Sequence, residues 1–113
     1  MVKVYGIKNC DSVKKAIRFL QENRIDYELV DFKTQPVDCS VIKPWLEQVG
    51  MKTLFNTRGT TYRTLKLKEL DLNEAEQLAW LCRENLLIKR PVLDRDGKIT
   101  VGFDPEHYKK LFA

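Results

Sequence analysis

The sequence has 113 residues, of which 43% are hydrophobic, so it can form one compact domain with its own hydrophobic core. Its 20 basic and 16 acidic residues give a net charge of +4, a small and scattered excess that does not by itself indicate a nucleic-acid partner. No apolar stretch approaches the ~20 residues of a membrane span, and the first ten residues lack the features of a signal peptide. We therefore expect a cytoplasmic protein without a membrane partner.

The first third of the chain predicts a β-α-β unit. Residues 2–7 and 26–32 are rich in strand-forming residues. Between them, apolar residues recur with the spacing of one helix face, which predicts an amphipathic helix over about 11–23. A strand, a helix and a strand within about 30 residues imply parallel strands with a right-handed crossover. The apolar helix face comprises Val13, Ala16, Ile17 and Leu20.

The middle of the chain is predicted to be helical. Gly50 ends a first apolar stripe, as glycine often does at a helix C-terminus. Pro44 must lie near the first turn of this helix or kink it, so the start of the helix stays open. Asn73, with Glu76 three residues later, predicts a capping box at the start of a second helix. The two buried stripes comprise Val41, Trp45, Leu46 and Val49, and then Leu78, Ala79, Leu81, Cys82 and Leu86.

After Pro91 the pattern changes to that of β-strands. Residues 92–101 form two short strand-like segments around Asp96-Gly97, a dipeptide that favours a tight hairpin. In the segment that follows, Asp104 is the predicted N-cap of a last helix, and Pro105 is its first residue.

The order of predicted elements is β-α-β, a helical insert, and then β-β-α. This order predicts an α/β protein with a thioredoxin-like fold, built on a mixed four-stranded sheet with a helical insertion. We expect a single thioredoxin-like domain over residues 1–113, with the helical insertion at about 34–88.

Cys10 stands between the first strand and the first helix. At this position, unpaired backbone N–H groups and the positive end of the helix dipole meet. Together with Lys8 and Lys14 they favour the thiolate, which is the nucleophilic form of cysteine. The alternative, from the residues alone, is a small apolar side chain that fills the turn between strand and helix.

Val13 decides which redox chemistry is open to Cys10. A dithiol site of the thioredoxin type would carry a second cysteine at this position, one helical turn along. Valine cannot resolve a mixed disulfide, so Cys10 is a monothiol candidate, and glutathione is the obvious small thiol donor. All three cysteines are expected to be mostly reduced in the cytoplasm. We expect Cys82 in the core and Cys39 nearer the surface, where a role as a remote resolving thiol stays open.

The remaining sequence features argue against a metal-binding site and indicate a site that binds anions. The cysteines form no C-x-x-C pair, and the single histidine, His107, has no partner at metal-ligand spacing. Arg58 and Arg63 lie in the segment NTRGTTYR, and Arg90 precedes Pro91. A guanidinium group binds carboxylates or oxyanions through paired hydrogen bonds. From the residues alone, solvated surface charge explains Arg58 and Arg63 equally well.

Three segments in combination resemble the arsenate-reductase-like (ArsC/Spx) family, and within it the YffB-type branch. They are YGIKNCDSVKKA (5–16), LFNTRGTTYR (54–63) and LIKRPV (87–92) with a following GF. The resemblance spans essentially the whole chain. It implies a thioredoxin-like fold with a helical insertion, in which Cys10 is the nucleophile and Pro91 is a cis proline that faces it.

The resemblance also implies a binding site around Cys10. By position, Arg58 and Arg90 match arginines that hold the oxyanion or thiol substrate in arsenate reductases, and the resemblance brings both to one cleft. Ser12 matches a hydroxyl-bearing position just after the nucleophile, where it bonds the thiolate or caps the helix. The expected substrate- or glutathione-binding residues are Lys8, Asn9, Ser12, Arg58, Arg63, Arg90 and Pro91.

Departures from the family pattern narrow the expected function. Arsenate reductases of this family have a histidine before the cysteine, in an H-N-P-x-C pattern, where this chain reads YGIKNC. Their third arginine falls near Gly102 here, and these two losses argue against efficient arsenate reduction. Spx-type regulators usually carry a C-x-x-C switch, which Val13 removes. What remains resembles the YffB-type proteins.

The expected function is therefore a glutathione-dependent monothiol reductase that uses Cys10 as its nucleophile. The alternatives are an arsenate reductase, or an Spx-like regulator that binds RNA polymerase. We expect no bound cofactor and no metal, with glutathione as co-substrate. The expected partner is glutathione or another thiol or oxyanion, and not a nucleic acid. A protein partner stays open, and the chain is expected to be a monomer.

Overall fold

The structure, a computed structural model, describes all residues, 1–113. The chain forms two compact units. The sheet unit comprises residues 1–35 and 90–113, and the helical unit comprises residues 36–89. The expected single domain, with its insertion at about 34–88, stays a prediction.

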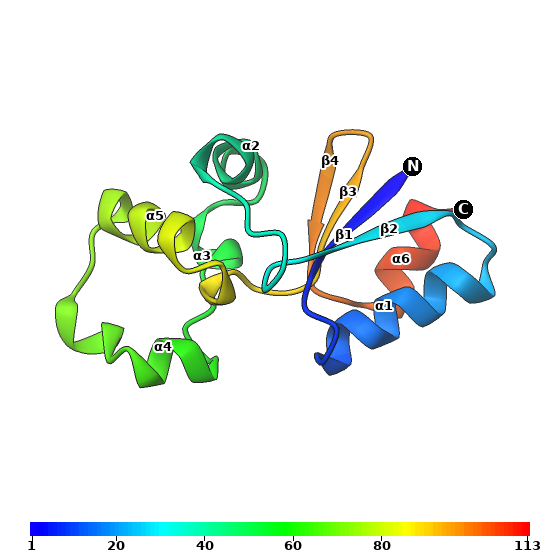
Figure 1. Cartoon of the computed structure of the whole chain (residues 1–113). Helices are drawn as coiled ribbons and strands as arrows, with labels where there is room; N and C mark the ends of the chain where they lie inside the picture. Colours follow the sequence, from blue (N-terminus) through cyan, green and yellow to red (C-terminus); the bar gives the residue numbers. More distant parts are fainter. The chain divides into compact units, whose positions relative to one another are not determined.

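A mixed four-stranded sheet forms the frame of the sheet unit (Figure 1). Strand β1 (Val2–Gly6) pairs in parallel with β2 (Tyr27–Asp31) and antiparallel with β3 (Val92–Arg95). Strand β4 (Lys98–Val101) pairs antiparallel with β3, so the strand order is β2-β1-β3-β4. The predicted α/β class, the parallel β-α-β pairing and the thioredoxin-like mixed sheet are confirmed.

Two helices of the sheet unit, α1 (Asp11–Glu22) and α6 (Pro105–Leu111), share one apolar core with strands β1 and β3. The ring of Phe19 on α1 meets the ring of Tyr108 on α6 edge-on, with 5.5 Å between centroids. The predicted apolar face of the first helix is confirmed, because its residues point into this core. The core residues are Val2, Val4, Val13, Ala16, Leu20, Leu93 and Tyr108.

Short helices make up the helical unit. Its two longer helices, α2 (Cys39–Val49) and α5 (Glu74–Arg83), pack against each other. Its buried hydrophobic residues include Ile42, Trp45, Leu54, Leu67, Leu81, Leu87 and Ile88. The other elements are α3 (Met51–Leu54), α4 (Thr60–Thr64) and the 3₁₀ helices η1 (Leu67–Leu70) and η2 (Asn85–Leu87).

A short backbone bridge joins two segments of the helical unit. Phe55 and Ile88 pair antiparallel. The backbone N–H groups of Asn56 and Lys89 donate hydrogen bonds of 2.8 Å to the carbonyls of residues 87 and 54, respectively. These bonds fix the backbone on both sides of the loop that follows α3.

Local sequence signals are confirmed at three places. The Asn73 side chain accepts a hydrogen bond from the Glu76 N–H at 2.8 Å, and the Glu76 carboxylate accepts one from the Asn73 N–H at 3.0 Å, which completes the capping box. Asp104 caps α6, which begins with a proline. Asp96 and Gly97 have φ angles of 52° and 89°, the two positive values that a tight hairpin needs.

The predicted burial of the second helix stripe is wrong in most of its positions. Only Leu81 is buried, whereas Ala79 is exposed and the other members are half-buried. A unit of this size cannot surround a helix, so one narrow side of α5 is covered. Helix α2 begins at Cys39, so Pro44 lies inside the helix and not in its first turn.

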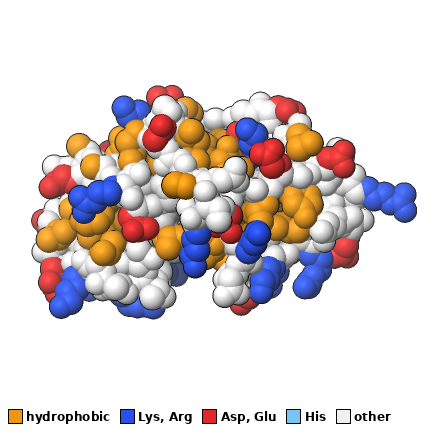
Figure 2. All heavy atoms as spheres, in the orientation of Figure 1, with side chains coloured by type: hydrophobic (Ala, Val, Ile, Leu, Met, Phe, Trp, Pro, Cys, Tyr) orange, Lys and Arg blue, Asp and Glu red, His pale blue; other side chains and the backbone are white.

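The surface carries both signs of charge. Lys and Arg side chains are interspersed with Asp and Glu side chains on the face shown in Figure 2. None of the helices has both the length and the apolar composition that crossing a membrane requires. No group of three or more His, Cys, Asp or Glu side chains is arranged to hold a metal ion.

Candidate active site

Cys10 lies at the junction between β1 and α1, where it is the N-cap residue of the helix. Its backbone is extended, with φ of −131° and ψ of 125°, and its carbonyl accepts the Lys14 N–H at 2.9 Å. The thiol caps none of the free N–H groups of the first turn. The side chain is half-buried and packs against the core of the sheet unit. The thiol therefore combines a fixed position with access to solvent.

Three further predicted site residues share this junction. Lys8 and Asn9 lie in the loop before Cys10, Ser12 lies in the first turn of α1, and all three are exposed. The unpaired N–H groups of the first turn add positive potential near the thiol, while Asp11 adds an opposing negative charge. The preference of Cys10 for the thiolate, and the role of Ser12, stay predictions.

Asp31 anchors the loop before Cys10, and sequence reasoning missed it. Its carboxylate accepts hydrogen bonds from the Lys8 N–H at 3.2 Å and the Lys33 N–H at 2.9 Å. Asp31 is only 8% exposed, and a buried carboxylate needs such partners. The sequence signal for Asp31 was its position near the end of the second predicted strand. Because β1 and β2 are parallel, the segments that follow them begin at the same edge of the sheet.

Gly6 sets how closely α1 approaches β1. A Cβ atom at this position would lie 2.6 Å from Cγ2 of Val13, closer than real Cβ contacts come. The Gly6 carbonyl also accepts the Phe32 N–H at 2.8 Å. A larger residue would push the strand and helix apart, so glycine here fixes the place from which the Cys10 loop starts.

Arg90 and Pro91 lead into β3. The Arg90-Pro91 peptide bond is cis, which confirms the prediction made from the family resemblance. Pro91 is buried, and its carbonyl accepts the Gly102 N–H at 2.8 Å. Arg90 is half-buried. That Pro91 faces Cys10 stays a prediction.

Arg58 lies in the helical unit, at a cavity of about 370 Å³ that we call the basic cavity. Three cationic side chains line it, those of Lys52, Arg58 and Lys89, and no carboxylate does. Phe55 and the polar residues Thr53, Asn56 and Thr57 complete the lining. This set of groups can bind a small molecule that carries carboxylate or oxyanion groups.

Sequence reasoning missed Lys52 and Lys89 in this cavity. Lys89 stands directly before Arg90 in the segment LIKRPV, so its place in a family segment was an available signal. Lys52 gave no such signal, because it lies in a short helix, α3, that the apolar pattern did not predict.

Arg63 holds the backbone that carries Arg58. Its guanidinium group donates to the Arg58 carbonyl at 2.9 Å and lies 3.5 Å from the Thr60 hydroxyl oxygen. The Arg58 N–H donates to the Asn56 side-chain oxygen at 3.1 Å. Arg63 thus positions the loop in this structure, and its direct contact with a substrate stays a prediction.

The predicted site residues therefore fall into two groups. The sheet unit holds Lys8, Asn9, Cys10, Ser12, Arg90 and Pro91, and the helical unit holds Arg58 and Arg63. In each unit, hydrogen bonds hold the backbone of a loop residue of this set, Lys8 in the sheet unit and Arg58 in the helical unit.

Cys39 and Cys82 form a disulfide. The expectation that all three cysteines are reduced is therefore wrong for this pair, and Cys10 is the only free cysteine. Cys82 is half-buried, so its expected place in the core is wrong too. The packing of α2 against α5 brings the two Cα atoms to 5.1 Å, a normal disulfide distance. A sequence separation of 43 residues could not indicate this pairing.

A family model described as the ArsC family matches residues 5–111. This chain belongs to the ArsC family. Among solved structures, the ArsC-family chain is similar to a YffB protein, with 36% identity, a TM-score of 0.92 and full coverage of both chains. It is also similar to a possible arsenate reductase from Streptococcus mutans UA159, with 35% identity and a TM-score of 0.83 over 100% of this chain and 98% of that one.

A curated relative in the same family has another function. The global transcriptional regulator Spx 2 of Bacillus anthracis is 29% identical over 115 residues, which cover 98% of this chain and 86% of that protein. The ArsC-family chain is thus similar to proteins named as a reductase and as a regulator.

Proposed function

We propose that this ArsC-family protein is a glutathione-dependent monothiol reductase with Cys10 as its nucleophile. One observation carries the proposal. Cys10 is the only free cysteine and stands at the N-cap of a helix, while the fully buried Val13 occupies the place of a second, resolving thiol. A thiol in this setting can attack a disulfide but needs a thiol from solution to finish the reaction.

The proposed cycle has two exchange steps. The Cys10 thiolate attacks the glutathione sulfur of a glutathionylated substrate; the bond to the substrate sulfur breaks, and the substrate leaves as a thiolate that takes up a proton. A glutathione thiolate then attacks the same glutathione sulfur. The bond to Cys10 breaks, Cys10 returns as a thiolate, and glutathione disulfide leaves. One free glutathione is consumed for each substrate thiol released.

The cationic side chains support glutathione as the co-substrate. Glutathione carries two carboxylates, and a guanidinium group can hold each through two parallel hydrogen bonds. We propose that Arg58, with Lys52 and Lys89 of the basic cavity, and Arg90 bind these carboxylates. The residues proposed to contact the rest of glutathione are Lys8, Asn9, Ser12 and Pro91.

The test is to mix the protein with glutathione disulfide and to measure its intact mass. We expect one glutathione adduct, which Cys10→Ser removes. The double variant Cys39→Ser/Cys82→Ser is the matched control and should keep the adduct. Addition of free glutathione should release it. A protein that forms no adduct, or forms it equally well without Cys10, contradicts the proposal.

Arsenate reduction is the second candidate function, because of the similarity to the structure from Streptococcus mutans. It predicts oxidation of glutathione that depends on arsenate and on Cys10. If neither the adduct nor arsenate-dependent oxidation is found, the similarity to Spx 2 favours a role in binding another protein. Capture of purified RNA polymerase by the immobilised chain would test that role directly.

A further inference from the structure

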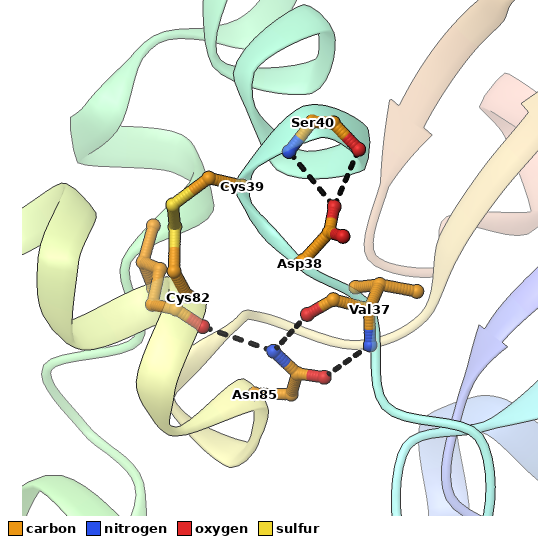
Figure 3. The surroundings of a disulfide bond; sticks show 7 residues. Val37, Asp38, Cys39, Ser40, Cys82 and Asn85 are labelled. Atoms are coloured by element: carbon orange, nitrogen blue, oxygen red, sulfur yellow. Dashed lines mark hydrogen bonds between the residues drawn. A yellow bond between two sulfur atoms is a disulfide. The ribbon is translucent and has the colours of Figure 1, made fainter.

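The Cys39–Cys82 disulfide is a second sulfur site in this protein, separate in chemistry from the free thiol of Cys10. Cys39 is the first residue of α2, and Cys82 lies in the last turn of α5 (Figure 3). Both side chains are half-buried, so part of each remains open to solvent. Partial exposure of both residues is the opening that exchange with a small thiol requires.

A buried hydrogen-bonded side chain joins the same two segments independently of the disulfide (Figure 3). The Asn85 side chain accepts the Val37 N–H at 2.7 Å and donates to the Val37 carbonyl at 3.0 Å. It also donates to the Leu81 carbonyl at 3.0 Å. Asn85 is only 5% exposed, so water competes little for these bonds. We call the Asn85 side chain, the Val37 N–H, the Val37 carbonyl and the Leu81 carbonyl together the Asn85 clamp.

The Asn85 clamp bonds backbone groups within two residues of each cysteine. Val37 lies two residues before Cys39, and Leu81 lies one residue before Cys82. If the sulfur–sulfur bond opens, the clamp still holds the two backbone segments together. The two thiols then remain near each other at a high effective concentration, which favours closure over reaction with another molecule.

We propose that Cys39 and Cys82 form a reversible dithiol–disulfide couple that opens and closes by exchange with small thiols while the helical unit stays folded. The inference concerns a site that the proposed reaction at Cys10 does not use. It makes the helical unit sensitive to the ratio of thiols to disulfides in its surroundings.

A thiolate from solution attacks the sulfur of Cys82; the Cys39–Cys82 bond breaks, a mixed disulfide forms at Cys82, and Cys39 leaves as a thiolate. A second thiolate attacks the mixed disulfide and leaves with the first as a small disulfide. Two electrons and, at neutral pH, two protons end on the cysteine pair.

Reduction should loosen the helical unit selectively. Helix α3 packs against both α2 and α5, so the covalent link between these two helices braces three elements. In the reduced state the Asn85 clamp and the packing of α2 against α5 remain, without the covalent link. We expect faster hydrogen exchange in α2 and α5 after reduction, and unchanged exchange in strands β1 and β3.

The experiment uses the full chain with Cys10→Ser, so that only the pair titrates. Oxidised and reduced samples are each equilibrated in buffers with a series of ratios of glutathione to glutathione disulfide. The samples are then quenched in acid and labelled with N-ethylmaleimide, and the intact mass of the protein is measured. We expect two labels to enter together, with the same curve in both directions. A pair that stays unlabelled in every buffer until the protein is denatured is an inert structural bond and overturns the proposal.

Two further outcomes would also overturn it. One is a reduced protein that loses its helical circular dichroism, because the couple must work in the folded state. The other is a reduced protein that re-oxidises to stable glutathione adducts or to covalent dimers instead of the internal disulfide. Adduct formation at Cys10 in the parent protein is measured separately, so its failure and the failure of this couple are distinguishable.

The Asn85 clamp itself can be tested by the rate of closure. Asn85→Ala should slow re-oxidation of the reduced pair roughly tenfold or more, since the thiols lose effective concentration. The control is Asn23→Ala, which removes an exposed side chain that bonds only the Phe19 carbonyl. Where Asn85→Ala does not fold, Asn85→Asp keeps the acceptor for the Val37 N–H and removes both donated bonds. Closure at the parental rate in a folded clamp variant contradicts the proposed role of Asn85.

Discussion

The two units of this protein reach order by different means. The sheet unit depends on long-range strand pairing and an apolar core shared by α1, α6, β1 and β3. The helical unit also buries apolar residues, but its helices are mostly too short to be stable alone, and cross-links add to its packing. Those cross-links are the disulfide, the Asn85 clamp and the Phe55–Ile88 bridge.

The same contrast appears in their chemistry. The sheet unit holds a free cysteine on a strand-to-helix junction, where a regular scaffold fixes a nucleophile. The helical unit holds paired cysteines on two helices and a cavity lined by cations, where a side-chain hydrogen bond from Arg63 holds the Arg58 backbone. Five sets of variants test this contrast.

The largest expected effect separates the two sulfur sites. Cys10→Ser should reduce glutathione-dependent reduction of a small mixed disulfide to background, since the cycle has no other nucleophile. Cys39→Ser/Cys82→Ser should retain most of the activity. The rate of glutathione disulfide formation, followed with a coupled reductase, measures both. Activity in Cys10→Ser would show that the reactive thiol lies in the helical unit and would reverse the comparison.

The second effect concerns the core of the sheet unit. Leu20 is fully buried in α1, and Leu20→Ala should lower the free energy of unfolding by about 2–5 kcal/mol, from lost burial and the cavity left behind. The control is Leu65→Ala, at a position that is 38% exposed, which should change it little. Urea unfolding of the parent and of both variants measures these free energies of unfolding. Equal effects would mean that α1 does not depend on this core.

The third effect concerns the cross-link of the helical unit. Cys39→Ser/Cys82→Ser should lower the free energy of unfolding by about 2–4 kcal/mol, because the bond closes a long loop in the unfolded chain. The difference from the parent should vanish when both are unfolded in dithiothreitol. A difference that persists in dithiothreitol would mean that the serines, and not the lost bond, cause it.

The fourth effect concerns recognition. In a Cys10→Ser background, Arg58→Ala or Arg90→Ala should weaken glutathione binding roughly tenfold or more, because a charge-assisted hydrogen bond is worth about 1.5–3 kcal/mol. Replacing either arginine by lysine should restore little of the affinity for glutathione. High salt should reduce the difference in affinity between the parent and the alanine variants. Arg83→Ala is the matched control, since Arg83 stacks on Trp80 and does not line the basic cavity. Calorimetric titration that finds parental affinity in both variants would make these arginines surface charge.

The smallest effect concerns the start of α2, beside the disulfide. The hydroxyl and N–H of Ser40 donate to Asp38 and lower the pKa of its carboxyl group. A carboxyl group whose pKa is lower in the folded state stabilises the fold above its unfolded pKa, about 3.9, and this contribution is lost as pH falls through the folded pKa. The Tm advantage of the parent over Asp38→Asn should therefore shrink below about pH 4. Asp26→Asn, at an exposed position outside the helices, serves as control. A Tm difference that is constant from pH 3 to 7 would contradict this.

Much of the sheet unit could be predicted from the sequence because its signals are local. Strand composition, the helical spacing of Val13, Ala16 and Leu20, and the Asp96-Gly97 turn each act within a few residues. The position of Cys10 at a helix N-cap follows from the same local order. In the helical unit, local chemistry predicted the Asn73–Glu76 capping box but not the short helices, whose residues carry no continuous apolar period.

Sequence signals alone were enough to predict the strands, the first and last helices, the α/β class and the placement of one cysteine without a nearby second one, because these depend on neighbours along the chain. The tertiary structure decided the partner of Cys39, the anchoring of the Cys10 loop by Asp31, and the gathering of Lys52, Arg58 and Lys89 around one cavity. Those contacts join residues that are far apart in sequence. The distances between these residues depend on how whole helices and strands pack. Such packing produces no periodic pattern in the sequence at the residues that it brings together.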